Sequence, residues 1–199
     1  MSQPTPAQVR AFYAHMLNRF GASVINKQSA VEMRGVALLL SQLGILDQDA
    51  FLKRFATTVG HRIYVPFQVG EPQDGWSLWS QIAVCAHECQ HIVQYDRYRP
   101  LGFAWQYVAT TAGRARLEAE AYRCQLELHF WRTGEILPAH EVAASLQHYG
   151  VSDADVKTAE TMLRVSGESV RRGAIVNRAS AVAIDWLNQH APELRTAGG

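Results

Sequence analysis

Apolar residues along this chain recur mostly three and four positions apart, which is the spacing of helices that bury one face. In the first third of the chain the pattern predicts helices over residues 6–20, 29–43 and 47–55, and glycines at 21 and 44 end the first two. The remainder predicts helices over residues 77–98, 103–111, 114–132, 138–149 and 153–187. Breaks are expected at 99–102, 113 and 134, and within the last segment at 166–167 or 173.

Residues 61–67 differ from the rest because they are rich in β-branched and aromatic side chains and lie between Gly60 and Gly70. This composition predicts a strand. Pro66, which has no N–H to donate, favours a position of that strand at a sheet edge. We therefore expect a predominantly helical α+β fold with a small β-sheet or edge strand before the 77–98 helix. The chain is interpreted as one domain, 1–199, with N-terminal helices over 6–56, a core over about 61–131 and a C-terminal helical portion over 138–188.

Composition places few constraints on function. The 199 residues are 48% hydrophobic and carry a formal charge of +1, which gives no electrostatic reason to expect binding to nucleic acid or to a membrane. The N-terminus does not resemble a signal peptide and no apolar stretch is long enough to span a bilayer, so the expected location is cytoplasmic. A solvated or substrate-facing surface is expected for the arginines around the 77–98 helix: Arg97, Arg99, Arg114 and Arg116.

The most informative motif is H-E-x-x-H, which this chain carries as His87-Glu88-Cys89-Gln90-His91 inside a predicted helix. Residues four apart on a helix lie one turn above each other and about 40° apart around the axis, so both imidazoles face the same way. Two ligands of one tetrahedral zinc need this geometry, and it places Glu88 beside the metal-bound water. His87 and His91 are therefore predicted to bind one zinc ion, with Glu88 as general base.

The three cysteines cannot form a closed disulfide framework. Cys85 and Cys89 each lie two residues, or about 200°, from a motif histidine. They therefore face away from the predicted metal, and we interpret them as thiols of the core.

A catalytic zinc site usually takes a third protein ligand and leaves the fourth position to water. Downstream, Glu118 and Glu120 both qualify, but two residues of separation on one helix turn them to different faces. An apolar stripe on this helix mildly favours Glu120, which lies about 60° from its centre, over Glu118 at about 100°. Asp96 is a weaker candidate because it follows His91 by five residues on the same helix.

The sequence also resembles a known protein family. The motif, followed by Glu118-Ala119-Glu120-Ala121-Tyr122 on the next strong helix, resembles the gluzincin clan of zinc metallopeptidases. Over residues 61–131 the chain is also similar to small bacterial H-E-x-x-H-x-x-Q domains that are minimal gluzincins. The clan's third ligand is a glutamate three residues before a small residue, which implies Glu118, before Ala121, with Glu120 as the alternative.

The resemblance implies a zincin-like fold and a zinc-dependent hydrolase, specifically a metallopeptidase that acts on peptides or proteins. Many clan members have Asp or Asn in place of Tyr122 to orient a ligand histidine, so Tyr122 would have to take that role differently. Further candidates for transition-state stabilisation or ligand support are Tyr95, Gln94, Tyr122 and Tyr107.

Two points stay open at the level of sequence. The alternative function is a non-catalytic zinc-binding or pseudopeptidase domain that acts in protein interaction; the presence of Glu88 argues against it. The 61–67 strand, if it lies at the edge of the cleft, could bind an extended peptide by strand addition. The oligomeric state and the role of the C-terminal helices are not predicted.

Overall fold

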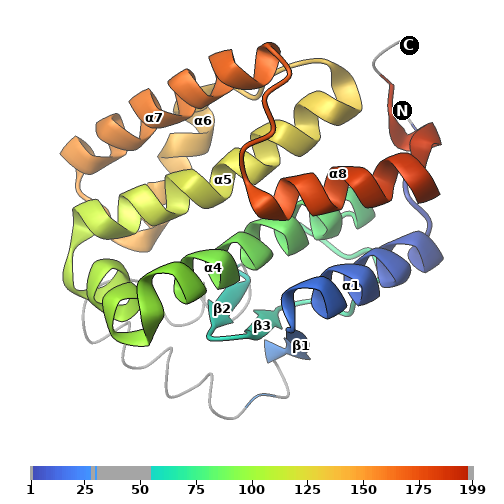
Figure 1. The fold of residues 1–199 in the computed structure, drawn as a ribbon, viewed down its shortest axis with the longest axis horizontal. Coiled ribbons are helices and arrows are strands. Elements are labelled where there is room, and N and C mark those ends of the chain that lie inside the picture. Colours follow the sequence, from blue (N-terminus) through green and yellow to red (C-terminus); the bar gives the residue numbers. More distant parts are fainter. Residues whose placement is uncertain (1, 28–29, 31–54, 197–199) are drawn as a thin grey trace.

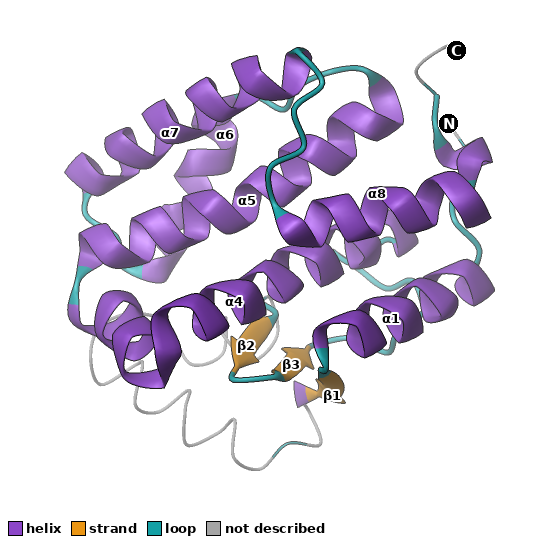
Figure 2. Ribbon diagram, in the orientation of Figure 1, coloured by secondary structure: helices purple, strands orange, loops and turns teal. Residues whose placement is uncertain are grey.

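The structure is a computed structural model that describes residues 2–27, 30 and 55–196, and the predicted helices over 29–43 and 47–55 fall outside these residues except at positions 30 and 55. In these described residues the chain is predominantly helical with one small sheet (Figures 1 and 2). The first helix, α1 (Pro6–Phe20), has the predicted bounds. A capping box between Thr5 and Gln8 begins it, and Gly21 in the left-handed conformation (φ 59°) ends it.

Within the described residues, the sheet has three strands in the order β1-β3-β2: β1 (Ser23–Asn26), β3 (Arg62–Val65) and β2 (Thr57–Val59). β3 is parallel to β1 and antiparallel to β2. The prediction of an edge strand over 61–67 is therefore wrong, because β3 is the central strand. β3 ends one residue before Pro66, so the missing N–H removes no ladder bond, and strand addition of a peptide to β3 has no free side.

The motif lies on the longest helix, α4 (Leu78–Ala104), which begins at the N-cap Ser77. As predicted, its course breaks at Arg99 (φ 62°), directly before Pro100. A π-helical turn, η2 (Trp105–Ala109), follows, and α5 (Thr111–Thr133) begins after the extended residue Thr110 and ends at Gly134. The joint expected at Gly113 is therefore at Thr110, with Gly113 inside the first turn of α5.

Four further elements follow α5 before the C-terminal turn. They are α6 (Ala139–Ala144), η3 (Ser145–Tyr149), α7 (Asp153–Arg171) and α8 (Arg178–His190), with η4 (Pro192–Leu194) at the end. Of the two breaks considered for the last segment, the structure has the one at Gly173, while Gly167 lies inside α7. α4 packs between α1, α5 and α8, and α7 covers the other side of α5 together with α6 (Figure 1).

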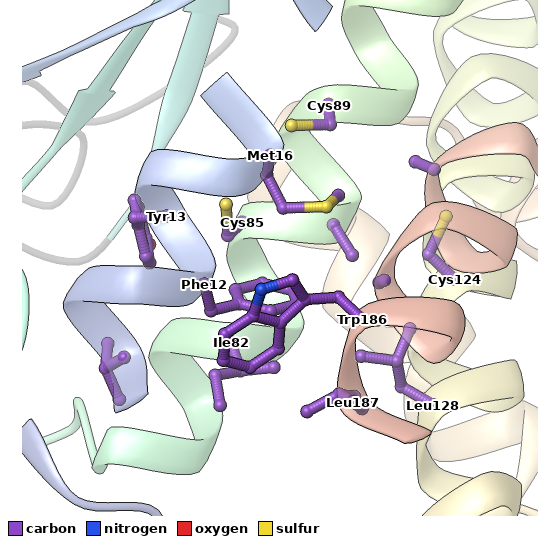
Figure 3. Close-up of a cluster of buried hydrophobic side chains, with 14 of the residues drawn as sticks. Phe12, Tyr13, Met16, Ile82, Cys85, Cys89, Cys124, Leu128, Trp186 and Leu187 are labelled. Carbon is purple, nitrogen blue, oxygen red and sulfur yellow. The ribbon is translucent and has the colours of Figure 1, made fainter. Parts of the chain in front are cut away.

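Two clusters of buried apolar side chains hold these helices together. The first joins α1, α4, α5, α8 and the sheet around Phe12, Ile82 and Trp186 (Figure 3). Cys85 and Cys89 belong to it and are free thiols, as predicted. The second cluster joins α5, α6 and α7. In the described part of the chain, no helix is both long and apolar enough to cross a membrane.

Candidate metal centre

Three side chains from two helices converge between α4 and α5. His87 and His91 lie on α4 and Glu118 lies on α5, and all three are buried. The two histidine Nε2 atoms are 3.1 Å apart. His87 Nε2 is 3.3 Å from Glu118 Oε2, and His91 Nε2 is 3.5 Å from Glu118 Oε1. Among the residues that the structure describes, this is the group of His, Cys, Asp and Glu side chains that could hold a metal ion.

These distances fit a tetrahedral metal. Zinc binds nitrogen and carboxylate oxygen at about 2.0–2.2 Å, so two neighbouring ligands of a tetrahedron are about 3.3–3.5 Å apart. The separations of His87 Nε2 from His91 Nε2 (3.1 Å) and from Glu118 Oε2 (3.3 Å) are close to two edges of one face of such a tetrahedron, while His91 Nε2 is 3.5 Å from the other oxygen of Glu118, Oε1. Three protein ligands at these corners leave the fourth corner to another ligand.

Unpaired polar atoms of His87 and Glu118 also indicate a metal site. Glu118 Oε2 and His87 Nδ1 are buried without a hydrogen-bond partner within residues 2–27, 30 and 55–196. Burying an unpaired carboxylate oxygen is costly, because the lost hydration is not replaced. A cation bound at the Nε2 atoms and Glu118 would compensate Oε2.

Gln94 and Tyr122 support the two histidines. Gln94 Oε1 lies 2.8 Å from His91 Nδ1, and Gln94 Nε2 donates to the Leu117 carbonyl at 2.8 Å. Since Gln94 presents an oxygen to Nδ1, the neutral ring of His91 carries its proton on that nitrogen, and in this form the Nε2 lone pair faces the group. The ring of Tyr122 packs edge-on against His87, with centroids 4.8 Å apart.

The electrostatics of the group are those of a buried ion pair. Burial lowers the pKa of His91, but the charge of Glu118 outweighs this and raises that pKa to about 9. Burial opposes ionisation of Glu118, yet the two histidines hold its pKa well below the usual range. Glu118 is therefore a carboxylate at neutral pH, the form that binds a cation.

Glu88 lies between the group and the sheet. Thr58 Oγ1 of β2 donates to Glu88 Oε2 at 2.7 Å, and it also lies 3.2 Å from the Glu88 carbonyl. A cavity of about 250 Å³ reaches His87 and Glu88. Aromatic side chains form much of its wall: Phe55, Trp76, Tyr122, His148 and Tyr149. A molecule bound in this cavity would contact Glu88 and His87.

The other acidic candidates point away from the histidines. Glu120 accepts from Gln90 Nε2 at 2.8 Å and from Arg97 Nη1 at 3.1 Å. Asp96 accepts a hydrogen bond from His61 Nε2 at 2.9 Å. The structure therefore brings Glu118 to the histidines and leaves Glu120 and Asp96 in ion pairs.

Among the tyrosines proposed from sequence, Tyr107 and Tyr122 reach the group. Tyr107 Oη donates to Glu118 Oε1 at 2.5 Å. Tyr95 instead packs against the rings of His61 and Phe103.

Two neighbours of the site were not found from sequence. Arg114, expected on a solvated or substrate-facing surface, is buried and donates to four backbone carbonyls. Its position four residues before Glu118, on the same helix face, was a signal that could have found it. Thr58 had no such signal, because it precedes Glu88 by thirty residues on a three-residue strand.

The sequence and the structure were compared with protein-family models, with curated proteins and with solved structures, and none of the three comparisons gave a match.

Proposed function

We propose that this protein is a zinc-dependent peptidase whose metal is held by His87, His91 and Glu118. One observation carries the proposal: His87 Nε2 lies 3.1 Å from His91 Nε2 and 3.3 Å from Glu118 Oε2, and one ligand atom from each of the three residues lies within 4.8 Å of the other two, with Glu88 beside them on a cavity. Two imidazole nitrogens and one carboxylate oxygen in this arrangement are a ligand set typical of catalytic zinc.

Zinc bound there would act as a Lewis acid that lowers the pKa of a water molecule and polarises a carbonyl. Glu88 would take the proton of the attacking water and later deliver it to the leaving amine. Thr58, which donates to Glu88 Oε2, orients that carboxylate. Gln94 keeps the His91 proton on Nδ1 and so leaves Nε2 free to bind.

The cavity gives the proposal its substrate class. The apolar and aromatic part of the cavity wall, which includes Phe55, Trp76 and Val84, suits an apolar side chain of a peptide. We infer that the substrates are peptides or unfolded proteins.

The test is cleavage of a fluorescently quenched peptide library by zinc-loaded protein, with Glu88→Gln as the inactive variant. We expect wild type to cleave, and Glu88→Gln to bind zinc equally well but to lose at least about 100-fold in rate. Glu120→Gln is the matched control, because Glu120 lies on the ligand helix but pairs with Gln90 and Arg97. Zinc-loaded wild type that cleaves no member of the library would refute the peptidase and favour a non-catalytic zinc domain.

A further inference from the structure

The two carboxylate oxygens of Glu118 have different surroundings. Oε1 accepts a 2.5 Å hydrogen bond from the Tyr107 hydroxyl and lies 3.5 Å from His91 Nε2. Oε2 is buried, lies 3.3 Å from His87 Nε2 and has no hydrogen-bond partner in the described part of the chain. Each oxygen thus faces one histidine, but within the described residues Oε1 also has a protein hydrogen-bond donor and Oε2 has none.

The backbone around Tyr107 is held in place by hydrogen bonds from Arg114. Tyr107 lies in η2, the π-helical turn between α4 and α5. Arg114 Nε donates to the Tyr107 carbonyl at 2.7 Å, and Arg114 Nη2 donates to the Val108 carbonyl at 3.1 Å. The remaining donor, Nη1, reaches the carbonyls of Tyr149 at 2.6 Å and Gly150 at 3.3 Å.

Close packing also fixes this turn against α5. A Cβ atom added to Gly113 would lie 2.5 Å from the Gln106 carbonyl oxygen and would also overlap Thr110 Oγ1. The π-helical turn and the first turn of α5 therefore leave no room for even a methyl group between them. The position of the Tyr107 hydroxyl is set by this contact and by Arg114.

We propose that Tyr107 occupies Oε1 of Glu118 and so restricts this ligand to one metal-binding oxygen, Oε2. Arg114 is a positioning residue that acts through Tyr107. The proposal rests on the metal site of the proposed function. Its consequence is specific: a carboxylate that binds through one oxygen leaves a coordination position open, which a hydrolytic site needs and a purely structural site does not.

Arginine suits the positioning role because its guanidinium carries five N–H donors in a fixed fork. Lysine in its place keeps the positive charge. Its single ammonium group cannot, however, bind the carbonyls of η2 and those of Tyr149 and Gly150 at the same time. Arg114→Lys should therefore loosen η2 and shift Tyr107, without removing any atom that touches Glu118.

The experiment compares the visible absorption of cobalt-loaded wild type, Tyr107→Phe, Arg114→Lys and Tyr95→Phe, each checked for folding by circular dichroism. Cobalt absorbs strongly in four-coordinate sites and weakly in five-coordinate ones. Tyr95→Phe is the matched control, because Tyr95 packs against His61 and Phe103. Zinc affinity, measured by competition with a chromophoric chelator, is the second readout.

We expect Tyr107→Phe to reduce the cobalt absorption as Glu118 binds through both oxygens, and to change zinc affinity by about 10-fold or more. Arg114→Lys should shift the spectrum in the same direction, and Tyr95→Phe should match wild type. A Tyr107→Phe spectrum identical to wild type would overturn the proposal, and an unchanged Arg114→Lys spectrum would overturn the role of Arg114. Wild type that binds no cobalt or zinc would instead refute the metal site itself.

Discussion

Gln94 and His91 lie one turn apart on α4 and share a 2.8 Å hydrogen bond between Gln94 Oε1 and His91 Nδ1. The other end of the same amide donates to the Leu117 carbonyl, next to Glu118 on α5. One side chain therefore sets the tautomer of one proposed ligand and fixes the backbone beside another. This relationship makes Gln94 the most direct test of how the fold prepares the site.

Gln94→Leu should weaken zinc binding by about 10- to 100-fold, because the His91 ring loses the acceptor that orients it. The variant should also lower the free energy of unfolding by about 1–3 kcal/mol, since His91 Nδ1 stays buried without a partner and the Leu117 carbonyl loses its side-chain donor. Chelator competition measures the first effect and urea denaturation the second.

Gln90→Leu is the control for this prediction. Gln90 is equally buried on α4, but it donates to Glu120 and accepts from the Ala179 amide. Its replacement should cost stability and leave zinc affinity within about twofold. Equal losses of zinc affinity in the two variants would mean that the effect of Gln94 is only structural.

Thr58 provides a test of the general base. Thr58→Val removes the hydroxyl that donates to Glu88 Oε2 at 2.7 Å and keeps the shape of the side chain. We expect kcat for peptide cleavage to fall by about 10-fold, with KM and zinc content unchanged, because a displaced base transfers the proton less efficiently. Thr58→Ser keeps the hydroxyl and should restore most of the rate. If both variants cleave like wild type, Thr58 does not orient Glu88.

The elements that carry the site could be predicted because their signals are local. The first helix, α1, has the predicted bounds and ends at Gly21, and Arg99-Pro100 breaks α4 where proline excludes regular helix. The spacing of His87 and His91 on one helix face fixes their proximity without any tertiary information. These features depend on neighbours within four residues.

The features that could not be predicted depend on contacts between distant segments. The apolar stripe on α5 favoured Glu120 over Glu118, but α5 is buried against α4, α7 and α8, so it has no single apolar face to act as a reference. Pro66 suggested an edge strand, but whether a proline interrupts a ladder depends on where the strand ends. In the same way, nothing local shows that Arg114 binds the carbonyls of Tyr149 and Gly150.

His61 predicts a pH dependence of stability. Its Nε2 faces Asp96 and its Nδ1 faces the carbonyls of Phe20 and Gly21, so both nitrogens meet acceptors and the protonated ring satisfies all of them. The hydrogen bond to Asp96 is the main cause that raises the His61 pKa. Because the folded pKa lies above the unfolded value of about 6.5, the stabilisation is complete below that pH and is lost as pH rises through the folded pKa.

The pair is largely exposed, so solvent screening limits its contribution to about 0.2–1 kcal/mol. Metal-free wild type should exceed Asp96→Asn in unfolding free energy by this amount near pH 5.5, and the difference should shrink towards pH 9. Urea denaturation in the presence of a chelator measures it. A difference that grows with pH would contradict the assignment.

The central claim is that His87, His91 and Glu118 form one metal site, and zinc content per chain tests it most directly. Elemental mass spectrometry would compare wild type, His87→Ala, Glu118→Ala and Glu120→Ala, each shown to be folded and purified without an affinity metal column. We predict close to one zinc per chain in wild type and Glu120→Ala, and none in His87→Ala and Glu118→Ala. Folded wild type that holds no zinc even when zinc is supplied, or loss of zinc in Glu120→Ala but not in Glu118→Ala, would contradict the site.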